Sequence, residues 1–359
     1  MSAGDDQSLL DRVEIPSIPK DAARKIAYLE EEFIRAEVDQ LRKSVPVLKP
    51  LFQKRNEIIN IPDVQSDFWI RVFSSAPAEV DEYVLPTDAA ALGSALKNLT
   101  VERFEVNDKG EGEPRSLRFT FDFHTGENNP FFENSQLVKE FSWRKQITKT
   151  AKGKSRTWEG LVSEPVRINW KKDMDLTKGL LDAACDLADA EKKQGGDRKK
   201  LPQYEALVKK VAEAEAEAMN ADEDDDEGME SPAGLSFFAW FGYRGRDVSA
   251  EQSKQATKED DERWAKIVKG ENVDEDEDED DEDDDDDDEE DDLEDAEIFA
   301  DGEELAVAIA EDLWPEALKY YVQSFEIGDD LSEIDIDEMD EDEDEAEGED
   351  AQPRKKART

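Results

Sequence analysis

The sequence predicts an α+β fold: a long helix, then a domain in which helices cover an antiparallel sheet of four or more strands, with disordered acidic segments. Apolar residues recur every three to four positions over about forty residues near the amino terminus. Between residues 99 and 170 apolar and polar residues alternate, as in the strands of a half-buried sheet. Farther on, nineteen acidic residues follow one another without interruption (residues 274–292) and separate two segments of core-like composition.

The candidate long helix covers residues 19–60 and follows a leader, residues 1–18, that we expect to be disordered. Pro46 and Pro50 lie inside it, and each should remove a backbone donor and kink the helix without ending it. A helix of this length with one apolar face needs a partner, either its own domain or a second copy of the chain. Its length favours the second copy. The candidate dimer-interface residues are Ile26, Leu29, Phe33, Leu41, Leu48 and Phe52.

The domain predicted over residues 61–328 begins with two short helices, residues 62–73 and 88–99. A meander of antiparallel strands follows, and the last strand closes it. The expected strands are residues 99–106, 116–123, 136–143 and 166–170. Residues 144–156 hold six basic residues and no acidic one, which predicts a basic hairpin or loop.

Helices are expected again in the second half of this domain. One begins near Leu176, and residues 201–219 form a charged, Ala-rich helix that should be largely exposed. The aromatic cluster LSFFAWF, residues 235–241, is typical of a core or an interface. Residues 296–322 form a closing helical segment that can cover one face of the sheet.

The acidic segments dominate the charge of the chain, which is −51 at pH 7. We expect an acidic linker (residues 220–232), an internal polyacidic loop (244–295) that is loose from its start to residue 262, and a disordered acidic tail (329–359) ending in a basic cluster. Because burying unpaired carboxylates is costly, no packed element can contain such runs. They are either solubilising spacers or polyanions that compete with nucleic acid for very basic partners.

Composition argues against catalysis. Cys185 is the only cysteine and His124 the only histidine, which excludes a Cys/His zinc site and an internal disulfide. His124 lies in a strand-like segment without a nucleophile pattern, and no Gly-rich phosphate loop is present. We therefore expect no enzyme activity, no cofactor and no metal site. The amino terminus has no signal-peptide pattern and no apolar run reaches membrane length, which predicts a soluble intracellular protein without membrane partners.

Five motifs occur in order along the chain. They are KPLFQKRNEII (49–59), NNPFFEN with KEF (128–134 and 139–141), INWKKDMDLTK (168–178), SFFAWF (236–241) and DLWPEALKYY (312–321). Together they resemble the nucleosome assembly protein family, and in particular its SET (template-activating factor I) branch. The chain departs from that pattern in one main respect, since its longest acidic run precedes the final core helix, whereas related proteins carry their acid mainly after it.

The resemblance implies a headphone-shaped homodimer, with paired long helices as the band and an α+β earmuff domain on each protomer. It also implies a histone chaperone that promotes nucleosome assembly and chromatin remodelling. Core histones, the H3–H4 pair and/or the pair of H2-type histones, would bind the acidic segments and the underside of the earmuff domain. The candidate histone-binding residues are Asp274, Glu275, Asp280, Asp285, Asp288, Asp292, Asp342 and Asp344.

Weak contact between double-stranded DNA and basic earmuff residues is implied as well. The candidates come from the basic stretch after the fourth expected strand and from the basic hairpin: Lys171, Lys172, Lys178, Lys145, Lys149, Lys152 and Lys154. Solubility or pairing with the protein's own acid explains these lysines equally well. A short basic cluster is a candidate nuclear-localisation signal and predicts a nuclear protein, with exchange to the cytoplasm left open. It consists of Arg354, Lys355, Lys356 and Arg358.

Two other functions stay open at this point. SET-type proteins are associated with inhibition of type 2A protein phosphatase, which would make this chain an interaction protein with a phosphatase or a histone-modifying enzyme as partner. Runs of Asp and Glu also coordinate hard cations loosely, which would suit a low-affinity calcium buffer. A simple buffer needs neither a long apolar stripe nor an aromatic domain, so the sequence argues against the buffer. It does not decide between the chaperone and the phosphatase regulator, and both functions can hold together.

Overall fold

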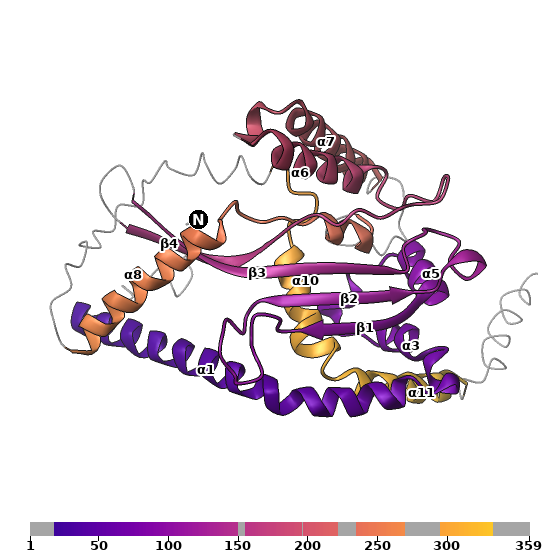
Figure 1. Ribbon diagram of the computed structural model, residues 1–359. Coiled ribbons are helices and arrows are strands. Elements are labelled where there is room, and N and C mark those ends of the chain that lie inside the picture. Colours follow the sequence, from indigo (N-terminus) through magenta and orange to yellow (C-terminus); the bar gives the residue numbers. More distant parts are fainter. Residues whose placement is uncertain (1–17, 150–154, 196, 222–234, 270–294, 333–359) are drawn as a thin grey trace, which may run out of the picture. The chain divides into compact units, whose positions relative to one another are not determined.

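The computed structural model describes residues 18–149, 155–195, 197–221, 235–269 and 295–332 of the chain (Figure 1). These residues form two compact units. The first contains most of the long helix together with residues 103–116, and the second contains residues 57–102 and everything after residue 116. Within the described residues no helix is both long and apolar enough to cross a membrane.

The first unit is built on α1, which runs from Lys20 to Ile59 with Pro46 and Pro50 inside it. The prediction of one long helix is therefore confirmed. Ion pairs between residues four apart, Glu31 with Arg35 and Asp39 with Lys43, lie along its polar side. The loop 103–116 is attached to α1 by side-chain bonds, such as the one from Arg42 Nε to the Gly112 carbonyl (2.7 Å).

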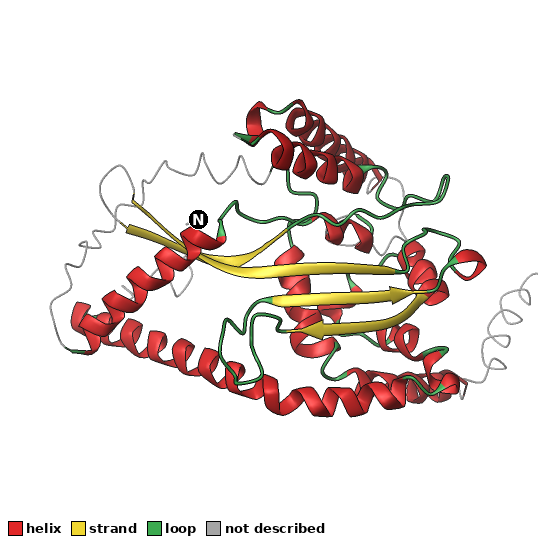
Figure 2. Ribbon diagram, viewed as in Figure 1, coloured by secondary structure: helices red, strands yellow, loops and turns green. Residues whose placement is uncertain are grey.

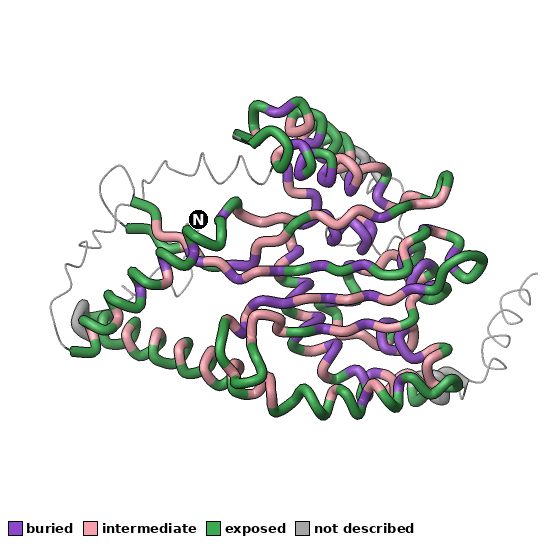
Figure 3. Tube along the Cα trace, in the orientation of Figure 1, coloured by how far each residue is buried: buried purple, intermediate pink, exposed green. Residues whose placement is uncertain are grey.

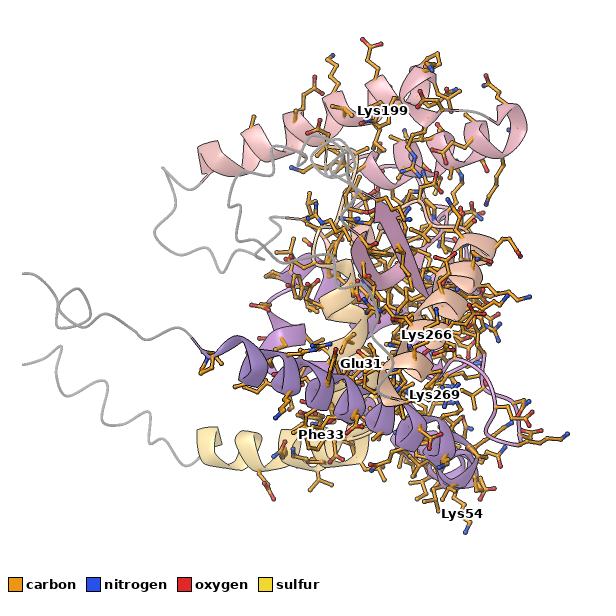
Figure 4. The ribbon with its side chains drawn as sticks, turned by 90° about the vertical axis from the view of Figure 1, so that its left-hand side faces the viewer. Glu31, Phe33, Lys54, Lys199, Lys266 and Lys269 are labelled. Atoms are coloured by element: carbon orange, nitrogen blue, oxygen red, sulfur yellow. The ribbon has the colours of Figure 1, made fainter. Side chains whose placement is uncertain are left out.

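The predicted apolar stripe of α1 is largely exposed in the single chain. Phe33 is 60% exposed, Leu29 52%, Ile26 46% and Leu48 39%, whereas Leu41 and Phe52 are half-buried. Phe33 is labelled on α1 in Figure 4. Four large apolar side chains in water on one helix are more than isolated surface residues, so this face is available to a partner.

The second unit contains a four-stranded antiparallel sheet in the order β1-β2-β3-β4 (Figure 2). The strands are Leu96–Glu102, Leu117–Phe123, Gln136–Lys149 and Ser155–Ser163. Buried and half-buried positions alternate strictly in β2, as the sequence predicts. The basic segment is a hairpin, because β3 continues to Lys149 and β4 returns from Ser155.

The prediction of a fourth strand at residues 166–170 is wrong. Only Trp170 forms a β-bridge, to Phe132, and the sheet is closed by β4 instead. The alternation of this segment has a different cause, because Ile168 and Trp170 pack into the core while the backbone bonds to the turn before β3. The Asn169 carbonyl accepts from Glu133 N, and Lys171 N donates to the Phe131 carbonyl.

Helices cover the buried face of the sheet (Figures 1 and 3). They are α2 (Pro62–Gln65), α3 (Phe68–Ser74), α4 (Ala78–Asp81), α5 (Pro86–Ala95), α10 (Gly302–Ala308) and α11 (Ala317–Ser332), with a π-helical turn at Ile309–Leu313. The predicted closing helical segment thus consists of three consecutive pieces.

The aromatic cluster forms the centre of this core. It lies in a short 3-10 helix, Phe237–Gly242, in which every residue is buried. The Trp240 ring lies 5.1 Å from both Phe119 and Phe141, and its Nε1 donates to the Gly302 carbonyl (2.9 Å). The expectation of a core position is confirmed, and the indole nitrogen has the partner that a buried tryptophan requires.

Two further helices pack together at the edge of this unit, α6 (Leu180–Gln194) and α7 (Pro202–Ala221). Helix α6 begins four residues later than predicted. Gly179 precedes it with a φ of 83°, and the Asp175 carboxylate accepts from the N–H groups of Thr177 and Gly179 in the preceding turn. The predicted charged helix is confirmed as α7, which buries only a few residues such as Leu207.

Residues 244–262 are not loose as expected, because Ala250–Val268 forms α8. A capping box starts this helix, with Ser249 Oγ accepting from Gln252 N and Gln252 Oε1 accepting from Ser249 N. Its buried face consists of Ser253, Ala256 and Asp260. Since this face has no large apolar residue, hydrophobic periodicity does not reveal it.

Candidate functional site

Most of the predicted polyanion lies outside the described residues. This holds for Asp274, Glu275, Asp280, Asp285, Asp288, Asp292, Asp342 and Asp344, for Lys152 and Lys154, and for the basic cluster Arg354, Lys355, Lys356 and Arg358. Their roles stay predictions. We define the acidic run as residues 274–292. The structure describes the chain up to residue 269 before this run and from residue 295 after it.

Helix α8 leads into the acidic run and is attached to β3. Because β2 pairs with β3 only as far as Phe141, the rest of this edge of β3 lacks a neighbouring strand. There Ser253 Oγ accepts from Lys145 N (3.0 Å), so α8 supplies a partner for the open edge. Lys266 and Lys269 mark the end of α8 in Figure 4.

After the acidic run the chain re-enters the domain at Glu297. Its Oε2 accepts from the N–H groups of Arg244 (2.9 Å) and Gly245 (3.1 Å), and its Oε1 from Phe299 N (3.2 Å). Burial raises the pKa of Glu297, although these backbone bonds favour the carboxylate. The described residues before and after the acidic run, in α8 and at Glu297, are thus attached to the sheet domain.

Lys145, one of the predicted DNA contacts, is buried in a network of ion pairs. Its side chain is 9% exposed, and its Nζ lies 2.6 Å from Glu159 Oε1 and 2.7 Å from Asp260 Oδ2. Burial lowers the pKa of Lys145, but the bonds to these two carboxylates outweigh burial and leave the pKa raised. The ammonium group is therefore committed to holding α8 on the hairpin.

Lys171 also has a structural role. Its Nζ donates to the carbonyls of Gly126 (2.9 Å) and Asn129 (2.5 Å), and so holds the turn before β3. The remaining described candidates, Lys149, Lys172 and Lys178, are exposed. Lys172 Nζ lies 3.8 Å from Asp173 Oδ2, and contact of these three lysines with DNA stays a prediction.

The face of the sheet opposite the aromatic core is exposed along the first half of β3. Gln136, Val138 and Glu140 point outward there, and Val138 is 36% exposed. Arg118 Nε bonds to Glu140 across the strands (2.6 Å). This open face is mixed in charge, which distinguishes it from the purely acidic segments.

A groove of about 630 Å³ adjoins this face, between β3–β4 and residues 244–250. We call it the arginine groove, because four arginines line it: Arg144, Arg198, Arg244 and Arg246. Gly245 has a φ of 67°, and a Cβ there would lie 2.8 Å from the Leu161 carbonyl, so only glycine suits this wall. In the sequence, only the closely spaced arginines of GYRGRD (residues 242–247) indicate this groove, and the signal is weak.

Two of these arginines are arranged around one acid. Arg244 Nη1 and Nη2 bind the two carboxylate oxygens of Glu191 at 2.9 and 2.7 Å, and Arg198 Nε lies 3.3 Å from Glu191 Oε1. Burial alone would raise the pKa of Glu191, but Arg244 and Arg198 lower it. Arg244 and Arg198 are therefore already engaged by a carboxylate of the chain itself.

A buried lysine supports the same wall. Lys139 Nζ donates to the carbonyls of Glu164 (2.9 Å), Phe241 (3.1 Å) and Tyr243 (2.7 Å). Burial lowers the pKa of Lys139 to about 7. Together with Glu297, which binds the next two N–H groups, Lys139 fixes the backbone that borders the groove. The alternation of β3 places Lys139 on the buried face, a signal that the sequence analysis did not use.

No group of three or more potential metal ligands occurs within the described ranges. The buried Lys139 and Glu297 are bonded to backbone groups, and the buried Lys145 and Asp260 are bonded to one another. The exposed charged side chains of the domain can bind charged partners by many contacts.

Comparison with known proteins places this geometry in a family. The family model "Nucleosome assembly protein (NAP)" matches residues 63–324. A putative nucleosome assembly protein of Schizosaccharomyces pombe is 33% identical over 155 residues, which are 43% of this chain and 59% of the relative. "Protein SET" of Drosophila melanogaster is 29% identical over 169 residues, 47% of this chain and 51% of the relative. The chain thus spans about half the length of these curated relatives.

Two solved structures are similar in fold. "Crystal structure of Ccp1" has 25% sequence identity and a TM-score of 0.46, and covers 85% of this chain and 96% of that one. "Crystal Structure of the Vps75 Histone Chaperone" has 19% identity and a TM-score of 0.41, with 85% and 99% covered. Since the family model spans well over half of the residues, this chain belongs to the nucleosome assembly protein family.

Proposed function

We propose that the protein is a histone chaperone, which binds core histones through its acidic segments and releases them to DNA during nucleosome assembly. The observation that carries the proposal is the placement of the acidic run. A stretch of nineteen acidic residues is inserted between α8 and Glu297, both attached to a domain of the nucleosome assembly protein family.

The binding would be electrostatic and collective. Each exposed ion pair contributes only about 0–1 kcal/mol, so affinity must come from the number of pairs formed with lysine- and arginine-rich histones. Screening lengths of about 8 Å at physiological ionic strength make such contacts sensitive to salt. Binding to the H3–H4 pair or to the pair of H2-type histones should therefore weaken steeply as salt rises.

A homodimer supports this mechanism by doubling the number of acidic runs in one particle. The exposed stripe of α1, with Ile26, Leu29 and Phe33 at its start, suits pairing with α1 of a second copy. Burial of each large apolar side chain would contribute about 1.5–3 kcal/mol. The exposed Lys149, Lys172 and Lys178 would give weak additional contact with DNA. The basic cluster at residues 354–358 would direct the protein to the nucleus.

The test is a plasmid supercoiling assay with core histones. It compares the intact chain with a variant in which residues 274–292 are replaced by a Gly/Ser segment of equal length. We expect the intact chain to deposit supercoils and the variant to lose most of this activity. Unchanged activity in the variant would move the histone site to the folded domain, and no activity in either protein would favour the type 2A phosphatase alternative.

A further inference from the structure

We propose that α8 is a detachable helix, which leaves the edge of β3 as a unit while the domain beneath it stays folded. Its detachment lengthens the free chain before the acidic run. The value of that extra length for binding basic partners rests on the proposed function, whereas the detachment itself does not. All contacts that carry this inference lie in the second unit, where α8 lies against β3 (Figure 1).

The excursion of the chain that contains α8 is closed at its base by bonds that do not involve the helix. Glu297 Oε2 accepts from Gly245 N (3.1 Å), although these two residues are 52 positions apart. The Arg244 carbonyl accepts from Ser163 N (2.8 Å), which fixes the same segment on β4. When α8 leaves β3, these bonds and the aromatic core behind them therefore stay in place.

The fully buried face of α8 is small. It consists of Ser253, Ala256 and Asp260, and among these only the methyl group of Ala256 is apolar. Trp264 and Ile267, closer to the end of the helix, are half-buried. Because burial of apolar surface contributes about 25 cal/mol per Å², this face holds the helix much less firmly than the aromatic core holds its elements. Local opening at α8 therefore has a lower free energy than global unfolding.

The ion pair between strand and helix can open without leaving either charge unpaired. Lys145 Nζ lies 2.7 Å from Asp260 Oδ2 on α8 and 2.6 Å from Glu159 Oε1 on β4. Lys145 and Glu159 are opposite each other in the ladder of β3 and β4, so they stay together when α8 leaves. Asp260 keeps Arg263 of its own helix, at 3.6 Å. Since a buried ion pair is costly to break mainly when a charge is left alone, these second partners make the contact releasable.

Bonds within α8 allow it to move as one element. The capping box at Ser249 closes its first turn, and pairs of residues four apart follow along its exposed side, Gln255 with Glu259 (2.7 Å) and Lys258 with Glu262 (3.8 Å). None of these bonds depends on β3, so the helical conformation does not have to be lost before the helix leaves.

Detachment changes the length of free chain around the acidic run. The helix takes up nineteen of the residues between Gly245 and Glu297. Released as a helix it adds about 28 Å to the free segment, and fully extended up to about 65 Å. The four consecutive acids at residues 259–262, one of them the buried Asp260, then face a basic partner together with the acidic run.

Exchange of lysine backbone amides tests the detachment without any histone. In protein labelled with ¹⁵N-lysine, the Lys145 N–H reports its bond to Ser253 Oγ, whereas the Lys139 N–H lies on the same strand opposite Phe119 of β2 and reports the sheet. In the natural chain, Lys145 should exchange about a hundred-fold faster than Lys139, at a rate that low urea concentrations leave unchanged, because the opening is local. Equal protection of the two amides would overturn the proposal.

Two matched variants test the role of the ion pair. Asp260→Asn should speed exchange at Lys145 about ten-fold and leave Lys139 unchanged, because it weakens only the contact of α8 with β3. Asp261→Asn makes the same change at the next, exposed position of the helix and should alter exchange at Lys145 less than about three-fold. Equal acceleration at both lysines, or equal effects of the two substitutions, would contradict a releasable ion pair.

Poly-L-lysine as long as the acidic run tests the link to that run. Its binding should speed exchange at Lys145 about three-fold in the intact chain, because a bound polycation favours the state with the longer free segment. A chain whose run is replaced by Gly/Ser should show no acceleration. An intact chain without acceleration would overturn the link. A chain that releases α8 as expected but deposits no supercoils would contradict the proposed function and leave the detachable helix in place.

Discussion

Two surfaces of opposite chemistry pack against β3, one on the part that contains Phe141 and one on the part that contains Lys145. Over the first part, Phe141 lies against Trp240 within an aromatic core. Over the second part, Lys145 lies against Asp260 on a helix face made of small and polar residues. The first surface stabilises through apolar area and close packing. The second depends on paired charges, whose attraction must offset their loss of water. Large apolar side chains therefore reveal one contact in the sequence, while the other becomes visible only in the fold.

The largest loss of stability is expected at the aromatic core. Trp240→Ala should lower the free energy of unfolding by about 3–5 kcal/mol, because it leaves a cavity and removes the bond from the indole Nε1 to the Gly302 carbonyl. Guanidinium unfolding followed by fluorescence measures the loss. Phe325→Ala, at a side chain that is 46% exposed, is the control and should cost far less. Equal losses would mean that the Trp240 cluster is not the centre of stability.

At the polar contact, Lys145→Met should cost about 2–3 kcal/mol, because the buried Asp260 loses its nearest cation and keeps the exposed Arg263 at 3.6 Å. Hydrogen exchange should become faster in α8 and stay unchanged in α3, since the loss is local. The double variant Lys145→Met with Asp260→Leu should recover much of the stability, because it removes both charges. A double variant as unstable as the single one would show that the ion pair is not the reason for the loss.

Lys139 is a charged residue on the first part of β3, which packs on the aromatic core. Its pKa is about 7 when folded and 10.5 in the unfolded chain, so the unfolded state binds more protons between these values. Stability contributed by Lys139 should therefore rise with pH in this window, by up to about 1.4 kcal/mol per pH unit, and fall as pH drops through about 7. Urea unfolding at pH 7.5 and 8.5 measures it as the difference between the natural chain and Lys139→Met. A difference independent of pH would contradict the lowered pKa.

The smallest effect concerns the start of α8. Ser249→Ala removes the oxygen that accepts from Gln252 N, and should cost about 1 kcal/mol. Exchange of the first turn of α8 should become faster, whereas the Lys145 contact farther along keeps the rest of the helix in place. Ser249→Asp, which can also accept this bond, should restore protection. An unprotected Ser249→Asp variant would show that the hydroxyl acts in another way.

The sequence predicts a structural feature well when the residues that form it are close together along the chain. The long helix, the alternation of β2 and the aromatic cluster follow from neighbouring residues, and each was predicted. The prediction of a strand at residues 166–170 was wrong. Ile168 and Trp170 alternate with polar residues because they pack into the core, and only the single bridge at Trp170 pairs this segment with another. Five of the candidate DNA-binding lysines are described, and two of them, Lys145 and Lys171, are structural.

The sequence by itself determined the acidic run, the apolar stripe of α1 and the membership in a family, since these depend on composition and local period. Only the tertiary structure decided which charges are available to partners. Lys145 meets Asp260 115 residues later, and Lys139 bonds to carbonyls 102 and 104 residues away. A charged side chain carries the same letter whether it is solvated or paired, and its role follows from the neighbours that folding brings to it.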